Sequence, residues 1–300
     1  MRFLFRTLFF TVFILGFSLS GFSQDKVKSL KVMTYNIWNG FDWGKDSLRQ
    51  ESLIQWVKEQ NPDVLALQEL CGYNEEKLRH DAAQWGHPYV QILKEGGYPT
   101  ALTSKEPIEL IEKNVSNFWH GLLHVKTFGI DFFVVHLSPS DSDTRLREAK
   151  QIKSRIQELQ SDSYIILGDF NTHSPFDSYW LESRKELRDG MATAKNEKYS
   201  NLRLGEFDYA PMAELLSIPT VDLSLGKADL EESFTFPTPA LIGLYDQTPE
   251  TILQKRVRID YILASPALAQ TCSQVNIFNH GATEKLSDHF PMMAEFQIAK

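Results

Sequence analysis

The chain has few cysteines and fewer basic than acidic residues, and both shortages exclude classes of protein. Cys71 and Cys272 are the only cysteines among 300 residues. An exported chain could pair them, but two cysteines do not make a disulfide framework, so we expect free thiols. Lysine and arginine total 31 against 39 acidic residues, a formal net charge of −8. This balance argues against a polybasic nucleic-acid-binding protein.

Long apolar runs, repeats and several well-known catalytic signatures are absent after the first 23 residues. That part of the chain contains no P-loop, no G-x-S-x-G nucleophile turn and no Rossmann fingerprint. These absences argue against P-loop nucleotide hydrolysis, serine-hydrolase chemistry of that type and dinucleotide binding.

The first 23 residues, MRFLFRTLFFTVFILGFSLSGFS, have the pattern of a secretory signal peptide. Two arginines precede an apolar run from Leu8 to Phe17, and Gly21 and Ser23 provide the small-x-small cleavage pattern. The run is shorter than the roughly 20 residues that span a bilayer, which favours cleavage over an uncleaved anchor. Without its two arginines the chain keeps 29 basic and 39 acidic residues, a formal net charge of −10.

We predict processing between Ser23 and Gln24, because small residues follow the apolar run at the spacing that cleavage requires. The product would be a secreted or periplasmic protein of residues 24–300 without a membrane span. Mass spectrometry of the exported protein should find Gln24 as the first residue. An exported protein that still begins with Met1 would contradict this prediction.

Short β-branched and aromatic runs alternate with helical patterns along residues 24–300, which we interpret as one domain. Amphipathic helices are predicted over Lys45–Gln60 and Leu146–Leu159. A third is expected near Ser178–Leu187, inside a segment (172–257) interpreted as large loops on the same domain. Such alternation is typical of an α/β protein. The strands are predicted at Leu30–Tyr35, Val64–Leu67, Phe132–Leu137, Tyr164–Leu167, Ile259–Ala264 and Met292–Ile298.

Polar residues stand at the ends of these strands, where the chain leaves the core. Turn formation explains any one of them. Strand ends on one side of a sheet converge, however, so the whole group indicates a ligand site. In GDFN, an extended chain would point Asp169 and Asn171 to one side and Phe170 into the core. The group comprises Asn36, Glu69, His136, Asp169 with Asn171, Arg258 with Asp260, and Asp288 with His289.

These residue types suit hydrolysis of a phosphoester. Carboxylate and amide oxygens without cysteine select hard cations such as Mg²⁺, Mn²⁺ or Ca²⁺. An acidic protein that handles phosphate needs positive charge at its site, and a divalent cation supplies it. A cation, a histidine and an amide together meet the needs of water attack on phosphorus: charge neutralisation, activation of the nucleophile and help to the leaving group.

The motifs TYNIW, LALQE, HLSP, GDFNTH, RIDYIL and SDHFPM, in that order, resemble the endonuclease/exonuclease/phosphatase superfamily. The resemblance spans about residues 30–298. It implies a four-layer α/β sandwich, in which two mixed β-sheets pack face to face and helices flank them. The superfamily includes pancreatic-type deoxyribonucleases, apurinic endonucleases, bacterial sphingomyelinases and inositol-polyphosphate phosphatases.

Carried over to this chain, the resemblance implies a metal site and a water site. Glu69 would be the main metal ligand, with Asn36 beside it and Asp288 completing the acidic pocket. Asp169 would orient or deprotonate the attacking water, or bind a second metal. Asn171 would hold the phosphate.

The resemblance also implies roles for histidines. His289 would contact the phosphate and stabilise its developing charge, with Asp260 fixing its ring. His136 would lie near the leaving-group oxygen. Arg258, two residues before Asp260, is expected on the same strand face as a brace and substrate contact. The aromatic or acidic residue that some nucleases carry midway has no clear match, and Tyr98 is the nearest candidate for it.

Two other histidines have open roles. His120 and His124 in HGLLH have the i, i+4 spacing of a helical zinc pair, but Gly121 is a poor helix residue and no HExxH motif is present. We therefore favour His120 as a substrate contact at the phosphate over zinc binding. His173 is expected in a turn, where it could be exposed or contact the substrate.

The sequence therefore predicts an exported, metal-dependent phosphoester hydrolase that functions as a monomer. A phosphodiesterase acting on nucleic acid is the first hypothesis, on the frequency of nucleases in the superfamily alone. The acidic net charge favours smaller substrates, and a phospholipid head group, a sugar phosphate or an inositol phosphate is the first alternative. A non-catalytic binding module on the same fold is the second.

Overall fold

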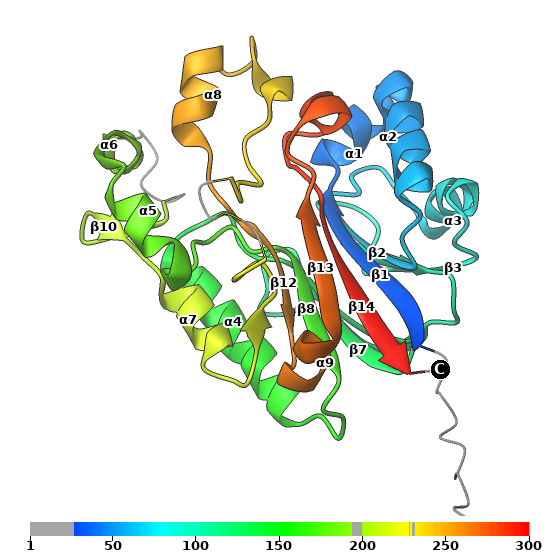
Figure 1. The fold of residues 1–300 in the computed structure, drawn as a ribbon. Coiled ribbons are helices and arrows are strands. Elements are labelled where there is room, and N and C mark those ends of the chain that lie inside the picture. The colour runs from blue at the N-terminus through cyan, green and yellow to red at the C-terminus, as the bar shows by residue number, and fades with distance from the viewer. Residues whose placement is uncertain (1–26, 194–199, 228, 230–231, 300) are drawn as a thin grey trace, which may run out of the picture.

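The computed structural model describes residues 27–193, 200–227, 229 and 232–299 (Figure 1). The predicted signal peptide and processing site lie outside these residues. Among the described residues, no helix has the length and apolar character needed to cross a bilayer. Both cysteines are buried free thiols, as the sequence predicts.

Two mixed six-stranded sheets form the framework. In order across the sheet, the first sheet contains β13 (Cys272–Ile277), β14 (Met292–Ala299), β1 (Val27–Asn36), β2 (Val64–Gln68), β4 (Ala101–Ser104) and β3 (Tyr89–Ile92). The second contains β11 (Val221–Asp222), β12 (Asp260–Ala264), β8 (Tyr164–Asp169), β7 (Ile130–His136), β6 (Leu122–Thr127) and β5 (Glu109–Asn114). A separate two-stranded ribbon pairs β9 (Leu202–Arg203) with β10 (Glu206–Phe207).

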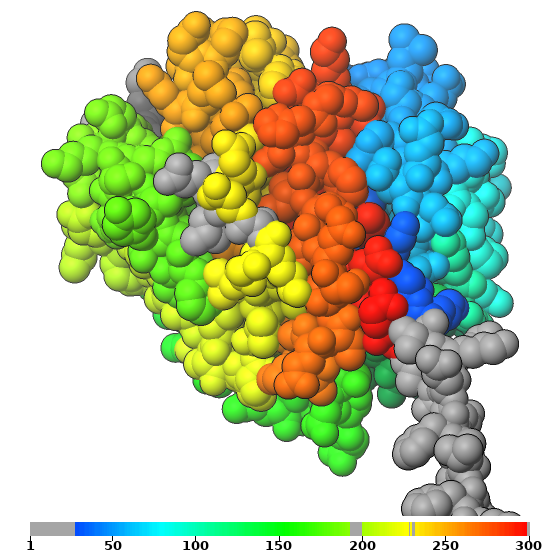
Figure 2. Space-filling model, viewed as in Figure 1, coloured from blue at the N-terminus to red at the C-terminus, as the bar shows by residue number. Residues whose placement is uncertain are grey.

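Helices flank the sheets. They are α1 (Trp38–Gly44), α2 (Ser47–Gln60), α3 (Glu75–Gln84), α4 (Ser142–Gln157), α5 (Ser178–Glu182), α6 (Lys185–Thr193), α7 (Ala210–Leu216), α8 (Pro249–Lys255) and α9 (Pro266–Thr271). In Figure 1, α2 and α3 lie outside the first sheet, while α4 and α7 lie outside the second. Figure 2 shows the orange-to-red C-terminal part between the blue N-terminal part and the green-yellow middle. The two ends of the described chain share one sheet, because β14 pairs with β1.

Three apolar clusters hold the four layers together. Between the sheets, Val32 of β1 packs in one cluster with Phe132 of β7 and Leu167 of β8. Outside the first sheet, the helices α2 and α3 pack on Leu65, and outside the second, α4 and α7 pack on Ile166. Each fully buried side chain of this kind stabilises the fold by about 1.5–3 kcal/mol. The four-layer sandwich that the resemblance implies is thus confirmed.

All six predicted strands are present, each within two or three residues of its expected ends. The helix expected over Leu146–Leu159 is α4, and the one over Lys45–Gln60 is α2. Asp46 caps the start of α2 by accepting a hydrogen bond from the Arg49 amide at 3.0 Å. The expected helix near Ser178–Leu187 is two helices, α5 and α6.

The connections bring the polar strand ends to one edge. The pairs β1–β2 and β7–β8 are parallel, so the two carboxyl ends of each pair lie together, and the hydrogen bond between Asn36 and Asp169 joins the two pairs of ends. β14 and β12 run antiparallel to β1 and β8, so their starts lie at that edge too. The register places Asp169 opposite both His136 and Asp260.

Gly168 allows the parallel strands β7 and β8 to approach at this edge. Its φ is +140°, and a Cβ there would lie 2.0 Å from the Val135 carbonyl oxygen. We predict that Gly168→Ala lowers the free energy of unfolding by about 3 kcal/mol, because a clash with backbone must be relieved by moving a strand. Urea denaturation measures this change.

The matched control for this variant is Gly190→Ala in α6. A Cβ at Gly190 would meet no described atom within 4 Å. This second alanine should leave stability unchanged or raise it slightly, because alanine favours helix. Equal midpoints for wild type and Gly168→Ala would contradict the close approach.

Candidate active site

The polar strand ends surround a pocket of about 590 Å³. Asn36 lies behind its wall, hydrogen-bonded to two of the lining carboxylates, and Asp260 lies behind His289. The predicted site residues that line the pocket itself are Glu69, His120, His136, Asp169, Asn171, Asp288 and His289.

Glu69 and Asp169 are held by one amide. Asn36 Nδ2 donates to Glu69 Oε1 at 3.2 Å and to Asp169 Oδ2 at 3.1 Å. Asn36 Oδ1 accepts the Trp38 amide at 3.1 Å, and the Asn39 amide donates to Glu69 Oε2 at 2.8 Å. In this arrangement Asn36 braces the two carboxylates. Ligation of a metal by Asn36 through its side-chain oxygen stays a prediction.

Burial makes the carboxylates of Asp169 and Asp288 hold protons more tightly than usual. It raises the pKa of Asp169 to about 7, against the opposing charge of His289 and with the help of Asp260. Burial likewise raises the pKa of Asp288 to about 7, and the charge of Glu69 adds to the rise. Acidic oxygens crowded in a small buried space, without a thiol, are the donor set of a hard divalent cation. Glu69 and Asp288 would hold it.

Asp260 and His289 form a buried pair. His289 Nδ1 lies 2.8 Å from Asp260 Oδ2, and its Nε2 lies 3.7 Å from Asp169 Oδ2. Burial opposes a charge on the ring, but the carboxylates of Asp260, Asp169 and Asp288 outweigh it and hold the pKa of His289 well above its usual value. Asp169, Asp260 and His289 also have oxygen and nitrogen atoms within 4.8 Å of one another. A protonated ring cannot ligate a metal, so we read this group as a charged hydrogen-bonded pair facing a carboxylate.

A stacked pair of histidines forms another wall. The rings of His120 and His136 lie 4.0 Å apart and nearly parallel. His136 Nε2 lies 3.4 Å from Asp169 Oδ2. Burial lowers the pKa of His120 to about 3 and the pKa of His136 well below its usual value, so both rings are neutral at physiological pH. Neutral imidazoles can donate or accept a hydrogen bond near the leaving-group oxygen.

Phe170 points into the core between two site residues, as predicted. Its side chain is fully buried beside Tyr261, with ring centroids 5.3 Å apart. Asn171 departs from the extended conformation, because its φ is +48°. Its backbone N–H donates to Asp169 Oδ1 at 2.9 Å, and its side-chain Nδ2 donates to the Leu137 carbonyl oxygen at 3.0 Å. The stretch is therefore both a turn and part of the pocket wall.

A model of the endonuclease/exonuclease/phosphatase family matches residues 33–289. The chain belongs to that family. Membership indicates a phosphoester hydrolase of nuclease or phosphatase type, and enzymes of the family generally use divalent metals. No curated protein matches the chain.

Solved structures share the family fold. An AP endonuclease from Archaeoglobus fulgidus is 22% identical, with 90% of this chain and 100% of that chain covered and a TM-score of 0.68. A 3'-5' exonuclease from Neisseria meningitidis is 19% identical, with 90% of this chain and 100% of that chain covered and a TM-score of 0.65. An endonuclease/exonuclease/phosphatase family protein from Bacteroides thetaiotaomicron is 17% identical, with 92% and 100% covered and a TM-score of 0.56.

Arg258 does not contact the substrate pocket, contrary to the prediction. Its guanidinium donates to Asp177 at 2.9 and 3.1 Å and to Asp222 at 3.0 Å, and all three side chains are buried. Arg258 precedes β12, which begins at Asp260, so the alternation of a strand does not extend to it. In this family member Arg258 is part of a buried ion cluster and does not brace the Asp260–His289 pair.

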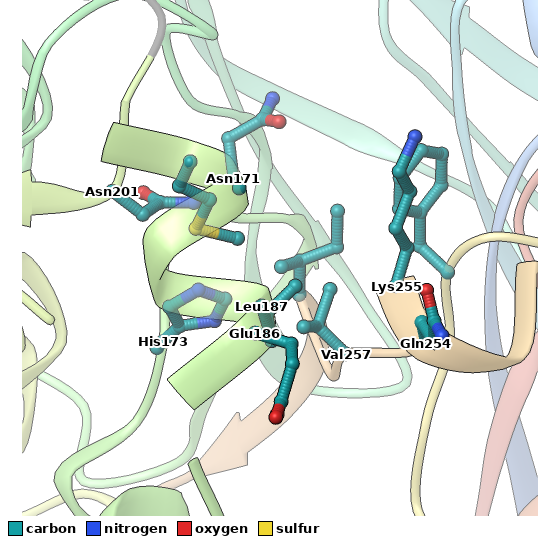
Figure 3. Close-up of a pocket in the computed structure, with 12 residues that line it drawn as sticks. Asn171, His173, Glu186, Leu187, Asn201, Gln254, Lys255 and Val257 are labelled. Atoms are coloured by element: carbon teal, nitrogen blue, oxygen red, sulfur yellow. The ribbon is translucent and has the colours of Figure 1, made fainter. Parts of the chain in front are cut away.

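The two remaining histidines separate in the fold. His124 lies on strand β6, where Nε2 contacts Asp131 Oδ1 at 2.8 Å, so it forms no helical zinc pair with His120. His173 is buried against Phe207 and lines a neighbouring pocket of about 460 Å³. In Figure 3, His173 lies on the α6 side of that pocket, across from Gln254 and Lys255 of α8. The two pockets share Asn171 and Phe236.

Sequence reasoning missed the aromatic residues of the active-site pocket. Trp38 begins α1 and the other four lie outside the helices and the sheet strands, so no periodicity marks them. Only Tyr98 is named from the sequence, as the nearest candidate for the aromatic or acidic residue that some nucleases carry midway. The aromatic lining residues are Trp38, Tyr98, Trp119, Phe236 and Tyr245.

Proposed function

We propose that this chain is an exported, divalent-metal-dependent phosphodiesterase in which water attacks phosphorus. The observation that carries the proposal is the buried Asp260–His289 pair, in which His289 Nε2 lies 3.7 Å from Asp169 Oδ2 at the pocket. The reaction needs two groups from the protein. The charged ring of His289 can stabilise the negative charge on the phosphate, and the carboxylate of Asp169 can orient the attacking water.

Each group then has a defined task. His289, charged through its contact with Asp260, donates a hydrogen bond to a phosphate oxygen. Asp169 accepts a hydrogen bond from the attacking water and orients it, and Asn171 holds the phosphate. His136 and His120 lie on the wall where the leaving oxygen departs. A divalent cation held by Glu69 and Asp288 would supply Lewis-acid charge at the phosphate.

Nucleic acid is the first substrate to test. An AP endonuclease and a 3'-5' exonuclease share this fold, and another solved relative is a 3' phosphatase from Neisseria bound to a product DNA hairpin, 18% identical, with 89% of this chain and 99% of that chain covered and a TM-score of 0.62. These relatives support nucleic acid as the first substrate class. A phospholipid, inositol phosphate or sugar phosphate is the second candidate, favoured by a pocket that no described lysine or arginine lines.

A hydrolysis panel tests the proposal. The purified exported protein is incubated with Mg²⁺ or Mn²⁺ and plasmid DNA, RNA, sphingomyelin, inositol phosphates and nitrophenyl mono- and diesters. We expect turnover of at least one diester and its loss on chelation with EDTA. Tight substrate binding without turnover of any ester would instead indicate a binding module on this fold.

A further inference from the structure

The turn labelled α1, which follows Asn36, is left-handed. From Asn39 to Trp43 the backbone has φ angles of 51° to 62° and ψ angles of 28° to 53°, and Trp38 before them has a φ of 54°. Gly40 adopts such angles without strain, but they cost free energy at residues that carry a bulky side chain. Contacts from outside the turn must therefore hold it in this conformation.

The left-handed turn orients Glu69. The Asn39 amide donates to Glu69 Oε2 at 2.8 Å, while Oε1 accepts a hydrogen bond from Asn36 Nδ2 at 3.2 Å. Gly40 lies so close to the chain after Glu69 that a Cβ there would be 2.0 Å from the Cys71 carbonyl oxygen. One oxygen of the carboxylate that would hold a cation is thus bound by an amide whose direction the turn sets.

Arg49 of α2 holds the turn. Nη1 donates to the Ile37 carbonyl and Nη2 to the Trp38 carbonyl, both at 2.9 Å. The guanidinium carbon lies 4.9 Å from the centroid of the Trp38 ring and 4.8 Å from that of the Phe41 ring. Asp46 accepts from Nε at 3.3 Å, and only 9% of the Arg49 side chain is exposed. A planar guanidinium suits this combination of carbonyl bonds and stacked rings, and an ammonium group does not.

The same guanidinium reaches the other side of the site. Nη1 also donates to the Leu286 carbonyl at 3.0 Å, two residues before Asp288. Ser287 adds to this connection, because its hydroxyl donates to the Asn36 carbonyl at 2.6 Å. Arg49 therefore joins the turn after Asn36 to the loop that carries Asp288, although 237 positions separate Arg49 from Leu286 in the chain.

We propose that Arg49 is a positioning residue for the metal site. It keeps the turn left-handed, and it fixes that turn, which orients Glu69, relative to the loop that carries Asp288. Arg49 acts through backbone carbonyls and does not itself line the pocket. Groups that orient a metal ligand from behind change metal affinity by roughly 10- to 100-fold when they are altered. This inference rests on the proposed function and adds a residue to its metal site.

Metal binding tests the proposal without any substrate. Mn²⁺ serves as the probe of a hard-cation site, and electron paramagnetic resonance follows the free ion as it is titrated into the exported protein. Arg49→Lys keeps the charge but cannot donate to three carbonyls while it lies between two rings. We expect the dissociation constant for Mn²⁺ to rise about tenfold in Arg49→Lys, and at least as much in Arg49→Gln.

The control variant is Arg155→Lys. Arg155 also joins two elements through a bidentate contact, because its Nε and Nη2 donate from α4 to Glu112 of β5 at 2.8 and 3.0 Å. It does not line the pocket, so this variant should keep the wild-type dissociation constant for Mn²⁺ whatever happens to its melting temperature. An unchanged dissociation constant in Arg49→Lys, or an equal rise in both lysine variants, would overturn the proposal.

Amide exchange in the metal-free protein tests the turn directly and covers the case in which Arg49→Lys does not fold. In wild type with EDTA the Asn39 amide should exchange slowly, because Glu69 already accepts its hydrogen bond. In folded Arg49→Lys this amide should exchange several-fold faster. Exchange of the wild-type Asn39 amide at the rate of an unprotected amide, measured by nuclear magnetic resonance, would contradict a prearranged turn and with it the role of Arg49.

The outcomes separate this inference from the proposed function. If wild type hydrolyses an ester with metal and both Arg49 variants bind Mn²⁺ as wild type does, the role of Arg49 is wrong and the proposed function stands. If wild type binds no Mn²⁺, both are wrong. A tenfold weaker binding in Arg49→Lys together with unchanged binding in Arg155→Lys supports the positioning role.

Discussion

Asp169→Asn and Glu69→Gln should each abolish hydrolysis while the protein stays folded. Asp169 loses its ability to accept the water proton, and Glu69 loses the charge that holds a cation. In metal-free buffer we expect little change in the melting temperature, or a slight rise, because burial already disfavours the charge of Asp169. Steady-state rates and thermal melts in EDTA measure the two effects.

Added metal sharpens this test. Wild type should gain stability from binding, by about 2.7 kcal/mol when free Mg²⁺ is a hundred times its Kd, and Glu69→Gln should gain less. Glu109→Gln, an exposed glutamate on β5, is the control and should behave as wild type. If Asp169→Asn unfolds the protein, or if either variant turns over substrate at the wild-type rate, the two carboxylates have a structural role alone and the catalytic assignment is wrong.

Asp260→Asn should lower kcat by about 10³-fold or more and leave the fold intact. The carboxylate fixes which nitrogen of His289 faces the phosphate and stabilises the imidazolium. An amide in its place removes the charge that outweighs burial, so the pKa of His289 falls and the ring faces the phosphate neutral or in the wrong tautomer. The measurement is kcat on a diester, with circular dichroism as the check on folding.

The chain contains a matched control for this pair. Asp131 contacts His124 Nε2 at 2.8 Å in a second buried pair on the strands β6 and β7, away from the pocket. Asp131→Asn should lower stability and leave kcat unchanged. If Asp260→Asn also keeps its turnover, Asp260 serves the structure alone.

Six of the twelve strands in the two sheets (β1, β2, β7, β8, β12 and β14) could be predicted because they obey strong local rules, and the other six could not. The central strands are apolar runs followed by Asn36, Glu69, His136 or Asp169, and α4 has an unbroken helical period. The spacing of apolar residues does not predict the directions of the strands. The resemblance to the superfamily provided the two-sheet arrangement. The exposed strand β5 (Glu109–Asn114) escaped notice, because its polar, half-paired residues carry little apolar signal.

The site was predictable where a residue directly follows or begins a strand and not where a loop sets its direction. Asp260 begins β12 opposite Asp169, and it contacts His289 Nδ1, the ring that the resemblance expects it to hold. Arg258, only two residues earlier, lies where Val257 pairs with Phe236 outside any long strand, so its side chain turns to Asp177. Trp119 and Tyr245 are placed by backbone contacts of their loops, which one sequence does not encode in any simple spacing.

The contact between Asn36 and Asp169 gives the catalytic centre a role in holding the molecule together. Asn36 ends a strand of the first sheet, Asp169 ends a strand of the second, and 133 positions separate them in the chain. Neither sheet alone carries all the residues of the site. A shift of one sheet relative to the other would therefore disrupt the site before either sheet unfolds. A cation bound at this site would link the two sheets. Amide hydrogens of β1 and β8 should therefore exchange more slowly when Mg²⁺ is present, and those of the distant ribbon β9–β10 should exchange at the same rate.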